Sequence, residues 1–108
     1  MVGFTGIKAV YLYPGLIDMR KGQKSLGSIV SEMTSAEQRR NSAFVFFGTS
    51  RKSLKIVLFD DKGSWMFQRK LTNYIFRVPE MENGKLKIEH GALETIIDEL
   101  TKITHCNK

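Results

Sequence analysis

Cysteine, histidine and proline are scarce in this sequence. It contains one Cys, two His and two Pro. A single Cys excludes a disulfide framework within the chain and favours a reducing, cytoplasmic setting. One Cys and two His also fall short of the four ligands that a structural zinc site requires. We therefore expect neither a structural metal site nor a disulfide-stabilised fold.

Long apolar runs are missing as well. No run approaches the roughly 18 residues needed to cross a bilayer, and the first residues lack the basic and apolar regions of a secretory signal, so we expect no membrane contact. The 108 residues, 42% hydrophobic and 26% charged, suit one globular domain. That domain is expected to span 1–108, with an ordered core at about 7–103 and a frayed tail at 104–108.

Positive charge is concentrated in the first three quarters of the chain. Residues 1–79 carry 13 Lys and Arg and 5 Asp and Glu, whereas residues 80–108 carry 4 and 6. The formal net charge is +6 at pH 7. A basic body of this kind indicates a polyanionic partner, most often nucleic acid, although positive charge also serves solubility.

The apolar pattern predicts an α+β fold. Apolar residues at helical spacing predict an amphipathic helix from Gln23 and a second helix over about 90–103. We expect a mostly antiparallel sheet of about five strands, with both helices on one face. The strands are expected at 7–13, 43–48, 54–59, 64–70 and 74–78, and 86–88 is a candidate for a short edge strand.

Two features refine this picture. Pro14 and Gly15 are expected to end the first strand, and Pro79 is expected to close the strand at 74–78. The run at 43–48 is almost continuously apolar, which indicates a central strand covered on both sides.

The hairpin within residues 54–70 turns at the sequence DDKG, residues 60–63. Asp first and Gly fourth favour a type I turn with a glycine bulge, which would place Lys55 opposite Arg69. Two opposed cations would suit a bound phosphate, or they would splay into solvent. A two-residue turn would instead place Lys55 opposite Gln68.

The loop at residues 18–22 reads DMRKG. Asp18 is expected to accept hydrogen bonds from following backbone N–H groups, as an N-cap or an Asx turn does. Gly22 would permit a close turn or a positive φ. Cations cluster at the start of the first predicted helix, whose N–H groups favour anions; they are Arg20, Lys21 and Lys24.

The sequence offers few candidates for catalytic residues. Asp18, Asp60 and Asp61 could hold Mg²⁺ as nuclease carboxylates do, but capping and turn formation explain them better. The sequence contains no Walker loop, no GxGxxG and no HExxH. His90, His105 and Cys106 flank the second helix without a nucleophile motif or an electropositive setting. We expect no enzymatic activity, no metal and no cofactor.

Basic residues interleaved with aromatic ones suit contact with single-stranded or distorted nucleic acid. Trp65 and Tyr74 are the candidates for an exposed aromatic surface, although aromatic side chains here can equally belong to the core. The predicted phosphate contacts are Arg20, Lys21, Lys24, Arg51, Lys52, Lys55, Arg69 and Lys70.

Together these motifs resemble the TnpB accessory proteins of the sixty-six class of bacterial insertion sequences, which are unrelated to the RNA-guided nucleases of the same name. The resemblance covers about residues 7–103. Its first block is Asp18-Met19-Arg20-Lys21-Gly22, with Leu26 four residues on. The second comprises Phe44-Val45-Phe46, Arg51, Leu54-Lys55-Ile56, Asp60, Gly63, Arg69-Lys70-Leu71, Phe76 and Pro79.

One residue and two short stretches depart from the family pattern. Phe59 stands where Trp is frequent, Arg69-Lys70-Leu71 replaces Lys-Arg-Leu, and Thr72-Asn73-Tyr74 replaces a Glu-Arg-Gly-type stretch. The last change removes a basic residue. The block at residues 18–22 is intact.

The resemblance implies a bacterial protein that assists transposition, while a separate transposase carries the catalytic carboxylates. Two hypotheses follow for its role. The chain contacts DNA phosphates through its basic residues, or it docks on the transposase or another protein of the element without touching DNA. The exposed edge of the sheet, or an aromatic patch around Trp65, would be the docking contact.

Overall fold

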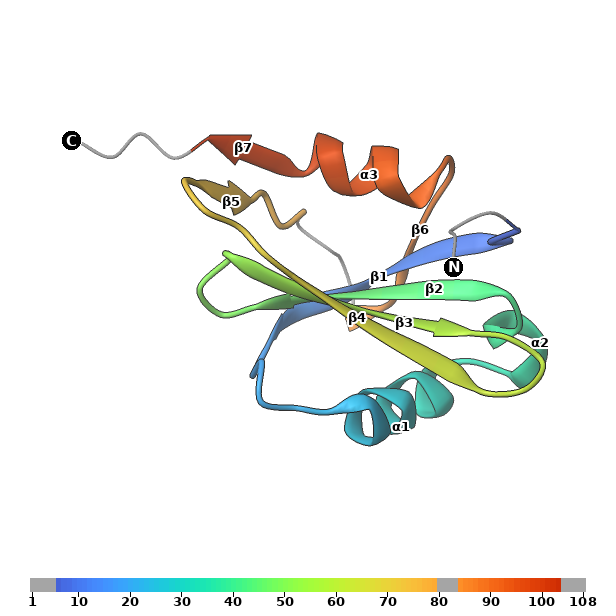
Figure 1. Cartoon of the computed structure of the whole chain (residues 1–108). Coiled ribbons are helices and arrows are strands. Elements are labelled where there is room, and N and C mark those ends of the chain that lie inside the picture. The colour runs from blue at the N-terminus through green and yellow to red at the C-terminus, as the bar shows by residue number, and fades with distance from the viewer. Residues whose placement is uncertain (1–5, 80–83, 104–108) are drawn as a thin grey trace.

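The computed structural model describes residues 6–79 and 84–103. Its centre is a five-stranded sheet with the order β4–β3–β2–β1–β6 (Figure 1). The strands are β1 (Ala9–Ile17), β2 (Ser42–Gly48), β3 (Ser53–Phe59), β4 (Ser64–Lys70) and β6 (Lys87–Glu89). Neighbouring strands run antiparallel except β1 and β2, which are parallel. The predicted α+β class and mostly antiparallel sheet are confirmed.

Helices complete the fold. The parallel pair β1 and β2 needs a crossover connection, and α1 (Gln23–Met33) and the short α2 (Ala36–Arg39) lie within it. Ser35 and Gln38 close a capping box at the start of α2. The third helix, α3 (Leu93–Glu99), follows β6.

The sheet is covered on both faces. Every residue of β2 is buried, as the apolar run predicted. Phe44 and Phe46 pack in a cluster with Leu26 and Val30 of α1, while the alternate residues of β2 pack in a second cluster with α3. Figure 1 shows α1 and α3 on opposite sides of the sheet. The prediction of both helices on one face was therefore wrong: a strand that is apolar on both faces needs a helix on each.

The first strand does not end at Pro14 and Gly15. β1 continues to Ile17, and its register against β2 shifts between Leu12 and Leu16. Gly15 has φ +106°, a conformation that favours glycine. Proline and glycine thus form a bulge here, because the chain regains its pairing on the far side.

The β3–β4 hairpin has the register of a two-residue turn. Lys55 lies opposite Gln68, and Phe59 lies opposite Ser64. The predicted pairing of Lys55 with Arg69 was therefore wrong. Gly63 does not have a positive φ, so the glycine bulge on which that register depended does not form.

The C-terminal helix is shorter than predicted. It ends at Glu99, and β7 (Thr101–Ile103) follows. β7 pairs antiparallel with β5 (Tyr74–Phe76) in a separate two-stranded sheet. Pro79 is half-buried and follows β5, three residues after the strand ends. The tail predicted at 104–108, with His105 and Cys106, lies outside the described residues.

Candidate functional site

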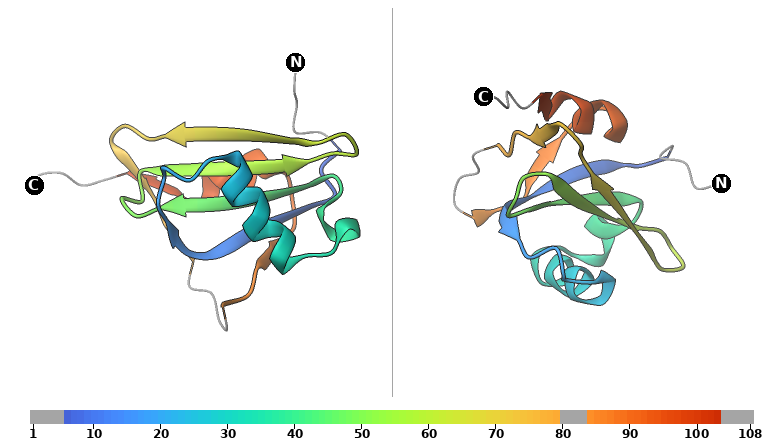
Figure 2. Two further views of the ribbon diagram at one scale, coloured as in Figure 1. Left: turned by 90° about the horizontal axis from the view of Figure 1, so that it is seen from below. Right: turned by 60° about the vertical axis from the view of Figure 1, so that its left-hand side comes forward.

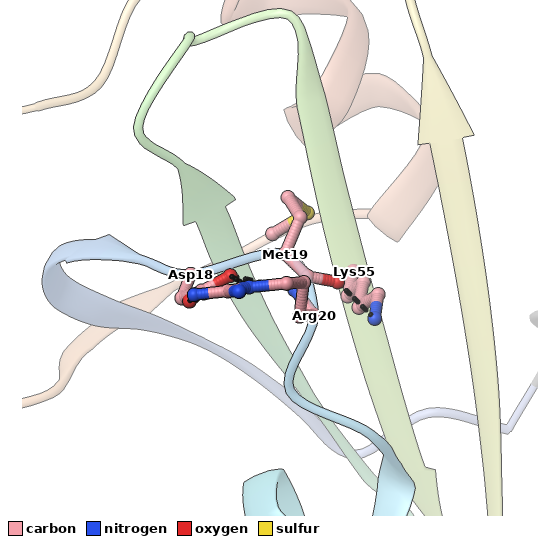
Figure 3. A network of polar contacts seen from close by, with 4 residues as sticks. All are labelled: Asp18, Met19, Arg20 and Lys55. Carbon is pink, nitrogen blue, oxygen red and sulfur yellow. Dashed lines mark hydrogen bonds and ion pairs between the residues drawn. The ribbon is translucent and has the colours of Figure 1, made fainter.

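The DMRKG loop, residues 18–22, connects the end of β1 to α1. Asp18 forms an Asx turn, since its Oδ1 accepts the backbone N–H of Arg20 at 2.8 Å. The Arg20 guanidinium also reaches Asp18, with Nη2 2.7 Å and Nε 3.0 Å from Oδ2 (Figure 3). The predicted Asx role of Asp18 is confirmed, whereas Gly22 is the N-cap of α1 and has an ordinary φ of −93°. Glycine is among the residue types favoured at an N-cap.

The ion pair changes the acidity of both groups. The hydrogen bonds from Arg20 lower the pKa of Asp18 to about 2, and the carboxylate raises the pKa of Arg20 above its usual value. The Arg20 side chain is 91% exposed. A phosphate approaching Arg20 would thus meet a guanidinium whose charge Asp18 already offsets.

Lys55 lies beneath this loop. Its side chain is on the α1 face of β3 and the residue is only 5% exposed. The ammonium donates hydrogen bonds of 2.7 Å to the main-chain carbonyls of Met19 and Lys21, and Figure 3 shows it pointing at the Met19 carbonyl. The burial of Lys55 removes it from the predicted phosphate contacts: its ammonium holds the loop instead.

Met19 fixes the other side of the loop. A Cβ added at Gly48 would lie 2.7 Å from Met19 Cγ, so the side chain of Met19 rests directly on the Gly48 backbone. Sequence reasoning missed both Gly48 and the structural role of Lys55. One lysine in the otherwise apolar segment LKIVLF was the available signal, because such a segment is expected to be buried.

The pairing of the strands places one end of each of β1, β2, β3 and β4 along the same side of the sheet. Ile17 pairs with Gly48, Phe47 with Leu54, and Ser53 with Lys70. We call this side the basic end. The β2–β3 turn is fastened here, since the Arg51 N–H donates to the Gly48 carbonyl at 2.9 Å. Five of the residues predicted to contact phosphates are exposed and belong to segments that meet at this end: Arg20, Lys21, Arg51, Lys52 and Lys70.

In the turn between β2 and β3, the backbone is strained at Arg51. Arg51 has φ 63°, in the left-handed region that L residues seldom adopt. Its carbonyl accepts the N–H of Phe76 at 2.7 Å, and the carbonyl of Lys52 accepts the N–H of Leu71 at 2.7 Å. These bonds tie the segment after β4 to the turn, which holds Arg51 and Lys52 in place.

Two predicted contacts lie elsewhere. Arg69 pairs with Leu54 and so faces α3, where it lines a cavity of about 410 Å³ with Glu94 and Asp98. Lys24 lies in the first turn of α1, beside Gln23, whose amide donates 2.8 Å hydrogen bonds to Ser64 at the far end of β4. Lys24 therefore lies away from the basic end, and Arg69, although adjacent to Lys70, points to the opposite face of the sheet.

Asp60 serves the hairpin turn at the opposite end of the sheet. Its Oδ1 accepts the N–H groups of Lys62 and Gly63, each at 2.8 Å, and its Oδ2 accepts the Trp65 indole N–H at 3.3 Å. The bond from Lys62 leads the causes that lower the pKa of Asp60. Its predicted turn role is confirmed.

Asp18 and Asp60, two of the carboxylates considered for Mg²⁺, lie at opposite ends of the sheet. Asp18 follows β1 at the basic end and Asp60 follows β3 at the other, and backbone N–H groups occupy both. In the described part of the chain, no three His, Cys, Asp or Glu residues gather closely enough to hold a metal ion. No described helix is long and apolar enough to span a membrane.

The two predicted surface aromatics are both exposed but are far apart along the fold. Trp65 is 46% exposed near the start of β4, and Tyr74 is 42% exposed in β5, beyond the other end of β4. They therefore do not make one patch. Trp65 instead stacks on Phe67, with ring centroids 6.4 Å apart.

Sequence comparison agrees with the resemblance carried by the DMRKG loop. The profile of the family described as "IS66 Orf2 like protein" matches residues 8–105. The chain belongs to this family. An uncharacterized protein, y4hO of Sinorhizobium fredii, is 32% identical over 88 residues, which are 82% of this chain and 76% of that protein. No solved structure matches this IS66 Orf2-like protein.

Membership of the IS66 Orf2-like family places the chain among proteins associated with insertion sequences. Three side chains of the first family block, Asp18, Met19 and Arg20, have structural partners here. Asp18 and Arg20 pair, Met19 packs on Gly48, and the carbonyls of Met19 and Lys21 accept the Lys55 ammonium. The first block and Lys55 of the second family block thus form one unit.

Proposed function

We propose that this IS66 Orf2-like protein is a non-enzymatic accessory protein of transposition that contacts DNA phosphates through the basic end of its sheet. The observation that supports the proposal is the meeting of cations from separate segments at one end. They are Lys21 of the DMRKG loop, Arg51 and Lys52 of the β2–β3 turn, and Lys70 at the end of β4. Arg20 contributes less, because Asp18 pairs with it.

Such a contact would depend strongly on salt. Each phosphate that the protein neutralises releases condensed counterions. The logarithm of the binding constant therefore falls linearly with the logarithm of the salt concentration, by about 0.9 per phosphate contact on duplex DNA. The proposed contacts join lysine and arginine side chains to phosphates, so the proposal is one of contact with the DNA backbone.

A matched pair of variants tests the proposal. Lys52→Gln removes a cation at the basic end, whereas Lys62→Gln removes one in the hairpin turn at the opposite end. Fluorescence anisotropy with labelled duplex and single-stranded DNA should show weaker binding and a salt slope lower by about 1 for Lys52→Gln alone. Equal losses in the two variants, or no binding at low salt, would refute the proposal.

A second candidate function is docking on the transposase or another protein of the same element. It is favoured by Trp65, which is 46% exposed, and by the adjacent cavity between β4 and α3, lined in part by Phe67, Leu93 and Ile97. Exposed aromatics beside apolar grooves are typical binding features. Capture of the purified transposase by the purified protein, unchanged by nuclease treatment, would support docking. Loss of capture after nuclease treatment would contradict it.

A further inference from the structure

β4 is the longer of the two edge strands of the main sheet. It has seven residues and pairs on one side with β3, and no other strand in the described ranges pairs with its second side. Figure 2 shows β4 along the rim of the sheet. The opposite edge, β6, has only three residues. A long edge strand offers a row of backbone donors and acceptors to another strand.

Hydrogen bonds at both ends of the hairpin reveal which backbone groups face outward. The Asp60 N–H donates to the Gly63 carbonyl, and the Leu71 N–H donates to the Lys52 carbonyl. Hydrogen-bonded pairs alternate along an antiparallel ladder, so the odd-numbered residues of β4 bond to β3. The residues whose N–H and C=O groups face outward are Ser64, Met66, Gln68 and Lys70.

One of these groups already has a bond. The Ser64 carbonyl accepts the amide of Gln23 at 2.8 Å, and a carbonyl oxygen has a second lone pair for a further donor. The outward edge is therefore a continuous ladder of four residues at alternate positions.

We propose that two copies of the chain pair antiparallel through their β4 strands, with the two-fold axis at Phe67. This register alone uses all four outward residues on each copy. Ser64 would pair with Lys70 of the second copy, and Met66 with Gln68. The two five-stranded sheets would then form one continuous sheet, with both α3 helices on the same face.

Side chains on the α3 face suit this register. Phe67 would lie opposite its own copy at the axis, and Trp65 would lie opposite Arg69 of the second copy. A guanidinium over an indole ring is a favourable cation–π contact. No two cations of the strands would be directly opposed, which makes the edge complementary to itself.

The cavity beside β4 supports a second copy as the occupant. Arg69 lines this cavity with Leu93 and Ile97, so Trp65 of the second copy, placed opposite Arg69, would lie at its rim. An indole that is 46% exposed in one copy would thus gain both an apolar surface and a cation. The inference stands on this edge and is independent of DNA contact at the basic end.

Sedimentation equilibrium of the full chain over a range of concentrations tests the proposal. We expect a dimer that Gln68→Pro weakens at least about tenfold, because each copy loses an outward N–H that β3 does not use. Gln68→Ala is the matched control, because it keeps the N–H and should dimerise like the wild type.

A charge pair keeps the test sharp if proline disturbs the hairpin. Trp65→Lys would oppose Arg69 of the second copy and should weaken the dimer, whereas Trp65→Glu would attract it and should weaken the dimer less. A monomer at every concentration, which would leave this edge to another protein, refutes the proposal. So does a dimer that Gln68→Pro leaves unchanged, or equal weakening by both Trp65 variants.

Discussion

Lys55 donates a hydrogen bond of 2.7 Å from its ammonium to the main-chain carbonyl of Met19, across 36 residues of sequence. A second bond of the same length reaches the carbonyl of Lys21. A side chain of β3 thus sets the shape of a loop that follows β1. The DMRKG loop is held from inside the protein, which leaves the side chains of Arg20 and Lys21 directed to solvent.

Replacing Lys55 by Met should destabilise the protein. The change keeps the unbranched side chain, one atom shorter, but leaves two carbonyls without their donor, at a cost of about 1–3 kcal/mol. Urea unfolding followed by circular dichroism measures the loss. Lys52→Met, at an exposed position three residues earlier, should stay within about 0.5 kcal/mol of the wild type. A Lys55→Met protein as stable as the wild type would show that the two bonds contribute nothing.

Replacing Gly48 by Ala should displace Met19. The new Cβ would lie 2.7 Å from Met19 Cγ, and such overpacking costs about 1–3 kcal/mol. Adding Met19→Ala should restore most of the stability, because it removes the atoms that clash. Denaturation of the two single variants and the double variant forms a cycle that measures this coupling. Additive losses would contradict the contact.

The Asp18 carboxylate should titrate at about pH 2, where the hydrogen bonds from Arg20 hold its pKa. Because this pKa is below the ordinary 3.8, the stabilisation is present above that value and is lost as the pH falls toward 2. Carbon-detected NMR of the side-chain carboxyl measures the midpoint. Arg20→Gln should raise it while leaving the backbone N–H bond in place. An unchanged midpoint in that variant would exclude the ion pair.

The fluorescence of Trp65 should report the protonation of Asp60. The indole N–H donates to Asp60 Oδ2, and the pKa of Asp60 is lowered, first by the backbone N–H of Lys62. Since Trp65 is the sole Trp, its emission should change with a midpoint below the usual range of an aspartate. Asp60→Asn should abolish that step. A step that persists in Asp60→Asn would have another origin.

The sequence predicted the elements better than their relations. Helix spacing found α1, and the apolar run found the buried β2, because each signal is local. Because β2 is apolar at every position, its sequence does not tell which helix packs on which face. The placement of α1 and α3 on opposite faces was therefore missed. The β3–β4 register depended on whether the turn has two residues or one more with a glycine bulge. The presence of glycine at position 63 did not decide between these two turns.

The candidate site shows the same division. An Asx turn at Asp18 follows from residue type and was predicted. The partners of Lys55 lie 34 and 36 residues away, and no local pattern connects them. Arg51, Lys52 and Lys70 lie at the same end of the sheet because of the order of the strands. Arg69 and Lys70 point to opposite faces because side chains alternate along β4.

The order of the strands also has a kinetic consequence. β2, β3 and β4 form a meander with short turns, whereas β1 joins β2 only across the α1 connection. Closing short loops costs less chain entropy, so we expect the meander to form first and the bonds of Lys55 to the DMRKG loop to form late. Substitutions at Lys55 should then accelerate unfolding and leave the folding rate almost unchanged.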